Sequence, residues 1–237
     1  MHWNGKTWSR QTKVPAVRGF LEAVAATRNT VWAVGYDELS GDGVILHETG
    51  GRWYVVPNGA PAGSFFDTVA VTGPKAAWAG GGGWDDPLYR WNGSVWKQYP
   101  LPLSNVEINR MAVISPEQIM AVGLPSGTDS VVSFLWNGSA WRAVPVPTPK
   151  YATLISVGAA SDGRAWAVGS YFYNDTTDTR TIIMYWNGSA WHQVNSPNPA
   201  GGDELYQVSA ASPRDAWAVG YTNSGTLILH WNGKNWS

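Results

Sequence analysis

An internal repeat constrains the fold of this chain more than any other feature. The phrase Trp-Asn-Gly, separated by two residues from a second Trp, recurs along the chain, and a degenerate copy, ETGGRW, starts at Glu48. Successive copies start 43 to 50 residues apart. A period of this length is typical of proteins in which one small unit recurs and packs against its neighbours. The five clear copies start at Trp3, Trp91, Trp136, Trp186 and Trp231.

Each unit contains four short segments with β-strand character. Strand A carries a phrase such as LYQVSA, and a polar turn such as SPRD (212–215) leads to strand B, which reads AWAVG. Strand C, as in TLILHW, is rich in β-branched and aliphatic residues. Asn-Gly then suits a type I′ hairpin turn, whose two central residues need positive φ. Strand D, as in WRAVPV, ends in Pro, which cannot continue a ladder.

Four antiparallel strands in a unit of about 40–50 residues predict one blade of a β-propeller. No helical periodicity competes with this interpretation. Small residues alternate with Trp and Val in strand B, which would let twisted sheets pack face to face. We therefore expect an all-β fold, a single five-bladed β-propeller over residues 1–237. The predicted blades are residues 19–57, 65–100, 107–145, 153–195 and 204–231, the last completed by residues 6–14.

The chain ends with a phrase, HWNGKNWS, that nearly repeats its beginning, MHWNGKTWS. The fifth unit has strands A, B and C, whereas its own strand D stops at Ser237. We expect residues 6–14 to supply that strand by pairing with residues 225–231, which closes the ring and removes exposed edges. On this hypothesis residues 1–5 and 235–237 are surplus and loosely held.

Composition excludes several function classes. The formal net charge is −1, so no strong basic field favours nucleic acid or acidic lipid. The chain has no Cys, which excludes thiol catalysis and thiolate metal sites. No apolar run approaches the ~18 residues of a membrane span. The first residues resemble a mature domain rather than a signal peptide, although a secretion signal lost upstream is compatible with them. We expect no nucleic-acid partner, no membrane insertion and a monomer.

The recurring aromatic and His residues have a structural interpretation. The Trp residues of the WNG phrase flank a hairpin in one register, where aromatic cross-strand pairs stabilise a sheet. His2, His47 and His230 directly precede the hairpin phrase or its degenerate copy, but Arg90 and Leu135 fill the same position in other units and cannot replace a His ligand. No GxSxG phrase and no Gly-rich phosphate loop opening a helix is present. We therefore expect no metal and no cofactor.

The connections vary on one side of the predicted disc only. The A–B turns and C–D hairpins are uniform and fall on one side, which we call the hairpin face. The B–C and D–A connections vary and fall on the other side, the loop face. Four of the five B–C connections pair an aromatic residue with Asp or Asn, a combination that suits stacking on a sugar and bonding its hydroxyls. The predicted ligand-binding residues are Tyr36, Asp37, Trp84, Asp85, Tyr171, Tyr173, Asp175, Tyr221 and Asn223.

A second hypothesis places carboxylates near the central channel. At the position two before the Val of the strand A phrase, the first two units carry Glu22 and Asp67. Glycoside hydrolases use two acids about 5–5.5 Å or 6.5–9.5 Å apart. Glu22 and Asp67 are thus the alternative catalytic residues. The other three units carry Asn109, Ile155 and Tyr206 in this position.

The phrases AWAVG, GTLILHWNG and WNGSAW resemble the Trp-rich repeats of bacterial, often secreted, β-propeller proteins, broadly related to sialidase-type and photosystem-assembly-factor propellers. SDGRAW (161–166) is similar to a shortened sialidase Asp-box, and GGWDD (82–86) to a tachylectin phrase, which occurs once here. The resemblance covers essentially the whole chain. It implies the propeller fold and an extracellular or cell-surface location, and transfers no binding residue.

These observations favour a non-catalytic binding module that is lectin-like and uses the loop face. The expected partner is a carbohydrate or a protein surface. A glycoside hydrolase and a protein-interaction scaffold are the alternatives.

Overall fold

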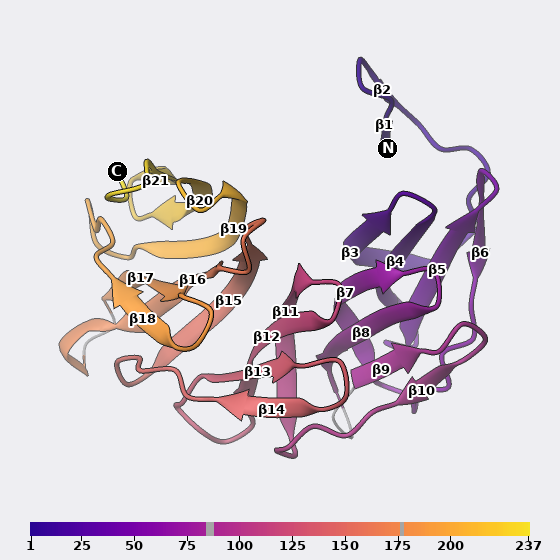
Figure 1. Ribbon diagram of the computed structural model, residues 1–237, viewed down its shortest axis with the longest axis horizontal. Helices are drawn as coiled ribbons and strands as arrows, with labels where there is room; N and C mark the ends of the chain where they lie inside the picture. The colour runs from indigo at the N-terminus through magenta and orange to yellow at the C-terminus, as the bar shows by residue number, and fades with distance from the viewer. Residues whose placement is uncertain (84–87, 176–177) are drawn as a thin grey trace.

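The computed structural model describes residues 1–83, 88–175 and 178–237. In these residues the regular secondary structure is all strand except for one turn of 3-10 helix (Figure 1). The strands form six antiparallel sheets, mostly four-stranded, which confirms the predicted all-β class. Across the described residues, no helix has the length and apolar character needed to cross a bilayer.

Five of the sheets are meanders in which each strand pairs with the next strand along the chain. In the first four, the strands correspond to A, B, C and D of the sequence unit. Their bounds are β3 (Gly19–Thr27), β4 (Thr30–Asp37), β5 (Gly43–Thr49) and β6 (Arg52–Val55); β7 (Phe65–Gly73), β8 (Ala76–Gly82), β9 (Leu88–Trp91) and β10 (Trp96–Gln98); β11 (Val106–Ser115), β12 (Gln118–Pro125), β13 (Val132–Trp136) and β14 (Trp141–Val144); β15 (Ala152–Ala159), β16 (Ala165–Phe172), β17 (Thr179–Trp186) and β18 (Trp191–Val194). The fifth sheet has three strands, β19 (Glu204–Ser212), β20 (Asp215–Thr222) and β21 (Gly225–Trp231).

The five sheets follow one another around an arc, with the first strand of each sheet towards the middle (Figure 1). These inner strands contact one another in order: β3 with β7, β7 with β11, β11 with β15, and β15 with β19. Trp residues fill the space between neighbouring sheets. Trp32 of β4 lies 5.1 Å, between ring centroids, from both Trp91 and Trp96 of the next sheet. The predicted structural role is confirmed for Trp136 and Trp186 of the hairpin phrase, which are buried, whereas Trp3 of the N-terminal hairpin is exposed.

A β-bulge recurs at one position near the start of every inner strand. The extra residue has no partner in the register of the adjacent strand. The Gly that closes the AWAVG phrase lies opposite, and a Cβ there would overlap a carbonyl oxygen of the bulged strand. The Gly is therefore required by the bulge, and not only by sheet-to-sheet packing. The extra residues are Glu22, Asp67, Asn109, Ile155 and Tyr206, opposite Gly35, Gly81, Gly123, Gly169 and Gly220.

The predicted pairing of residues 6–14 with residues 225–231 is not confirmed. Strand β2 (Trp8–Ser9) pairs with β1 (His2–Trp3) in a hairpin apart from the arc (Figure 1). The outer edge of β21 is occupied instead by the C-terminus: Trp236 bridges to Trp231, and Ser237 exchanges backbone hydrogen bonds with His230. A hairpin of a few residues closes at a far smaller entropic cost than a contact between the chain ends. Trp236 is also buried, contrary to the loose seam that the sequence suggested.

The first and last sheets each leave one apolar face exposed. Trp217 and Ile228 of the fifth sheet are 50% and 58% exposed, although the equivalent Trp166 and Ile183 of the fourth sheet are buried. In the first sheet, Val24 is exposed in the same way. The closed ring predicted from the sequence is thus not confirmed.

Candidate functional site

Exposed aromatic rings gather on the loop face. Phe20 lies at the start of β3, Tyr206 at the start of β19, and Phe172 and Tyr221 at the ends of their B strands. Antiparallel meanders bring the start of strand A and the end of strand B to the same edge of each sheet. The loop face therefore presents aromatic surface from the first, fourth and fifth sheets.

Two sets of these rings pack together. The rings of Tyr206 and Tyr221 are stacked, with centroids 5.5 Å apart and planes at 25°. The ring of Tyr36 lies 5.5 Å from that of Phe20 and 6.4 Å from that of Phe65, between centroids. In the first set, the Tyr206 hydroxyl donates to Glu204 at 3.2 Å. Desolvation, followed by hydrogen bonding and the Glu204 charge, raises the pKa of Tyr206, so its hydroxyl remains a donor.

Two predicted ligand-binding residues are engaged within the protein. The Asp37 carboxylate accepts hydrogen bonds from the backbone N–H groups of Leu39 and Ser40 at 2.9 and 3.0 Å, which lower its pKa. This arrangement shapes the B–C loop itself. The Arg180 guanidinium lies 3.3 Å from the ring centroid of Tyr173 and covers one face of that ring.

The remaining predicted residues are placed as follows. Tyr171 is half-buried and packs against the core of the third and fourth sheets. Asn223 is exposed on the last B–C turn, where its backbone N–H donates to Gly201. Asp175 ends the 3-10 turn η1 (Tyr173–Asp175), and its side chain is outside the described part. Trp84 and Asp85 lie outside the described residues.

The alternative catalytic residues Glu22 and Asp67 occupy adjacent bulges and interact electrostatically. Desolvation, and then the charges of Glu107 and Glu22, raise the pKa of Asp67 to about 6, against the opposing effect of Arg110. Arg110 donates to the Asp67 carbonyl oxygen at 3.3 Å and reaches Gln207 of the fifth sheet at 3.5 Å. The inner strands thus bring the carboxylates of Glu22, Asp67 and Glu107 near the guanidinium of Arg110.

Charge is distributed unequally between the two faces. Among side chains that the structure describes, carboxylates outnumber cations on the loop face, and the reverse holds on the hairpin face. Such separation favours partners of opposite charge at each face. On the loop face lie Glu22, Asp37, Glu38, Asp42, Asp67, Glu107, Asp129, Asp178, Asp203 and Glu204, with Arg18, Arg110, Lys150 and Arg180. On the hairpin face lie Arg28, Arg52, Lys75, Arg90, Lys97, Arg142, Arg164, Arg214 and Lys234, with Glu48, Glu117, Asp162 and Asp215.

The position before the hairpin phrase serves packing in each sheet. His47 stacks on Trp32 with centroids 4.0 Å apart, and His230 stacks on Trp217 at 4.3 Å. Arg90 takes the same place over Trp78, 5.4 Å from its centroid. Within the described residues, no group of three or more His, Cys, Asp or Glu side chains is placed to hold a metal.

Sequence reasoning missed Phe20, Phe172 and Tyr151 on the loop face. Phe20 lies at the start of β3 and Tyr151 in the connection that enters β15, so neither belongs to a B–C connection, where the aromatic residues were predicted. An aromatic residue at the start of strand A or directly before it was the available signal for these two.

No family model matches the chain, and no curated protein does. Among solved structures, the chain is similar to YCF48 bound to D1 peptide, with a TM-score of 0.63 and 15% identity over 95% of this chain and 67% of that one. It is also similar to the GH74 xyloglucanase from Xanthomonas campestris, with a TM-score of 0.65 and 15% identity over 92% of this chain and 38% of that one. YCF48 from Cyanidioschyzon merolae gives a TM-score of 0.55, 16% identity and coverage of 87% and 65%. These are β-propeller proteins, so the repeated sheets have a fold of the propeller type.

Proposed function

We propose that the chain is a non-catalytic binding module that holds a carbohydrate on its loop face. The observation that carries this proposal is the gathering of exposed aromatic rings beside carboxylates on that face, with the stacked pair Tyr206 and Tyr221 as the clearest example. An aromatic ring packs against the apolar face of a sugar, while carboxylate and hydroxyl groups bond its hydroxyls.

The rigid sheets support this role. The strand ends that carry the aromatic residues belong to ladders whose inner strands pack against one another. Their positions are therefore fixed before a ligand arrives, which lowers the entropic cost of binding. An extracellular or bacterial cell-surface location is part of the proposal, since glycans are abundant there.

The test is binding of the whole chain to a glycan array, followed by calorimetry with the best ligand. We expect Tyr221→Ala to weaken binding by about tenfold or more, and Tyr54→Ala, an exposed ring on an outer strand, to leave the affinity unchanged. If no glycan binds at high protein concentration, the carbohydrate proposal is wrong.

A protein partner is the second candidate. Two observations favour it: the excess of carboxylates on the loop face, and the likeness in fold to YCF48 bound to D1 peptide. An acidic face attracts a cationic peptide, and its affinity falls as salt increases. Binding to a peptide library that depends strongly on salt, without any glycan binding, would favour this candidate.

The hydrolase alternative has one observation behind it, the pKa of about 6 at Asp67 beside Glu22. A carboxyl group that remains partly protonated near neutral pH could act as a general acid. Asp67→Asn and Glu22→Gln test this alternative against a panel of oligosaccharides. Hydrolysis by the wild type that persists in both variants would exclude these two residues as its catalysts.

A further inference from the structure

A left-handed backbone position recurs in four of the connections that enter an inner strand. In each case the next residue along the chain is buried, and that residue is either the first of the inner strand or the one directly before it. The residues and their φ angles are Gly63 (79°), Asn105 (56°), Tyr151 (57°) and Gly202 (59°).

Tyr151 is the unexpected member of this set. Gly has no Cβ to oppose positive φ, and Asn tolerates it better than other residues. A bulky side chain is disfavoured there. Burial of the ring does not compensate, since Tyr151 is 41% exposed. The turn at this position would form more easily with Gly or Asn, as three of the four units show.

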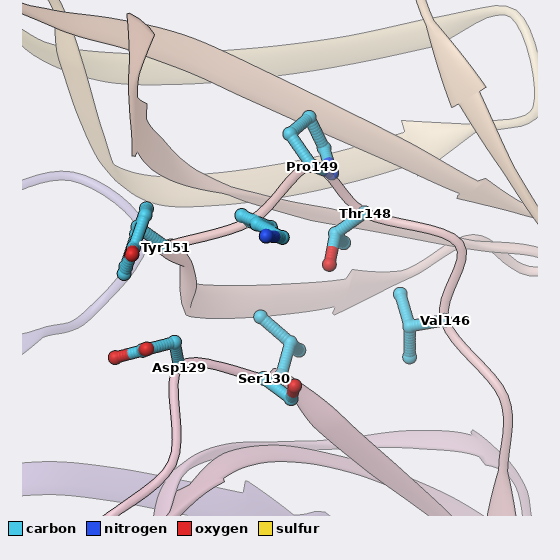
Figure 2. Close-up of a pocket in the computed structure, with 8 residues that line it drawn as sticks. Asp129, Ser130, Val146, Thr148, Pro149 and Tyr151 are labelled. Atoms are coloured by element: carbon cyan, nitrogen blue, oxygen red, sulfur yellow. The ribbon is translucent and has the colours of Figure 1, made fainter. Parts of the chain in front are cut away.

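The ring of Tyr151 lies at a pocket on the loop face. The cavity has a volume of about 370 Å³, within the usual range for small-ligand sites. Its walls are the B–C loop of the third sheet, with Asp129 and Ser130, and the connection to the fourth sheet, with Thr148 and Pro149. Figure 2 shows these two walls opposite each other, with Tyr151 at one end.

The lining combines apolar and polar groups. Val131 belongs to the core between the third and fourth sheets, Val146 packs against that core, and both contribute apolar atoms to the lining. Asp129 and Lys150 contribute opposite charges at its exposed rim. Neither charge dominates, which suits a neutral ligand with many hydroxyl groups.

We propose that this pocket is a carbohydrate-binding subsite, and that Tyr151 is retained in its unfavourable backbone conformation because its ring binds the sugar. The inference rests on the proposed function and names where on the loop face one sugar residue lies. The ring supplies the stacking surface, the Asp129 carboxylate accepts from sugar hydroxyls, and Lys150 and the Thr148 hydroxyl donate to sugar oxygens. Strain at a residue that a ligand needs is a recurring feature of binding sites.

The experiment combines stability and binding for Tyr151→Gly. The probes are soluble tetrasaccharides of glucose, xylose, mannose and N-acetylglucosamine, measured by saturation-transfer NMR and calorimetry on the whole chain. We expect the variant to melt at a temperature about 2 °C or more higher, because strain is removed, and to bind at least about tenfold more weakly. Tyr151→Phe keeps the ring and should retain most of the affinity. Asn105→Gly, at the equivalent position of the preceding unit, is the matched control and should leave binding unchanged.

Two results would overturn the inference without affecting the proposed function. One is a lower melting temperature for Tyr151→Gly, which would show that the ring serves packing. The other is unchanged affinity of that variant for a tetrasaccharide that the wild type binds, which would place the sugar elsewhere. If the wild type binds none of the four probes and no arrayed glycan, the proposed function falls and the subsite falls with it.

Discussion

The indole rings of Trp166 and Trp236 meet edge to face, with centroids 5.2 Å apart and planes at 89°. The same contact joins Trp78 to Trp141 between the second and third sheets, at 5.2 Å and 85°. The C-terminal Trp therefore fills, in the last sheet, the place that an internal strand D fills elsewhere. Together with Trp231, whose ring lies 4.9 Å from that of Trp166 between centroids, it packs the fifth sheet against the fourth.

This contact predicts different sensitivities at the two chain ends. Trp236→Ala should lower the free energy of unfolding by about 3–5 kcal/mol, since it removes a buried ring. Trp8→Ala should change it by no more than about 0.5 kcal/mol, because Trp8 is exposed on the separate hairpin. Urea denaturation followed by fluorescence measures both. A larger loss at Trp8 would support the strand exchange expected from the sequence.

The bulges make the facing Gly residues irreplaceable. Gly169→Ala would place a Cβ against the carbonyl oxygen of Thr153, so the strands must separate. We expect a loss of about 1–3 kcal/mol in unfolding free energy. Gly73→Ala is the control, because no atom lies within 4 Å of its would-be Cβ, and it should be neutral or stabilising by up to about 1 kcal/mol. Equal denaturation midpoints for the two variants would contradict the steric account.

Asp67 should make the fold less stable as pH rises. Its folded-state pKa of about 6 exceeds the ordinary value of 3.8, so the folded chain holds the proton more tightly than the unfolded chain. The unfolded form therefore gains stability relative to the folded form between about pH 4 and pH 6. In thermal melts, the melting temperature of Asp67→Asn should rise relative to that of the wild type as the pH increases through this interval. Above about pH 6 the difference between the two melting temperatures should stay constant. A difference that does not depend on pH would exclude titration of Asp67 as its cause.

Asp37 should behave in the opposite sense. Backbone hydrogen bonds from its own loop lower its pKa from 3.8, so its ionised form stabilises the fold. That contribution is present above about pH 4 and is lost as the pH falls through the lowered value. Asp37→Asn should therefore be less stable than the wild type at pH 7, with the gap narrowing towards pH 3. Melting curves at the two pH values decide this.

The open face of the fifth sheet predicts an asymmetry between equivalent residues. Ile183→Ala removes a buried side chain and should cost about 2–5 kcal/mol. Ile228→Ala changes an exposed one and should cost less than about 0.5 kcal/mol. Equal losses in denaturant melts would show that the face is covered in solution, as the predicted ring closure requires.

The sequence predicted the strands well because each unit carries its own turn chemistry. Asn-Gly does mark the C–D hairpins, but the predicted type I′ turn is wrong. Among these residues only the Gly has positive φ, as at Gly93, Gly138 and Gly188. The strands pair around a four-residue loop instead, in which the Asn side chain accepts backbone hydrogen bonds, as Asn92 does from Val95. The ends of the chain were predicted less well. The phrases at residues 1–9 and 230–237 are nearly identical, so by sequence either one could supply the fourth strand of the last sheet. The choice depends on how short the connecting segment is and on which Trp is buried, and neither is visible in a repeated phrase.

The surroundings of the candidate site residues could be predicted only in part for a similar reason. The loop face and the position of Tyr221 follow from repeat symmetry. By contrast, the engagement of Asp37 by its own loop and of Tyr173 by Arg180 depends on contacts within connections that have no repeat. The grouping of Glu22 with Asp67 was visible in sequence as equivalent positions on adjacent units. The bulge that displaces them from the ladder was not.

That bulge frees one side chain in each inner strand from the pairing register of its sheet. The extra residue has no partner opposite it in the ladder, so its side chain can differ from unit to unit while the ladder keeps its register. The side chains at this position already differ in every unit: they are Glu22, Asp67, Asn109, Ile155 and Tyr206. Selection or protein engineering could vary those five residues together and obtain new recognition surfaces on an unchanged scaffold.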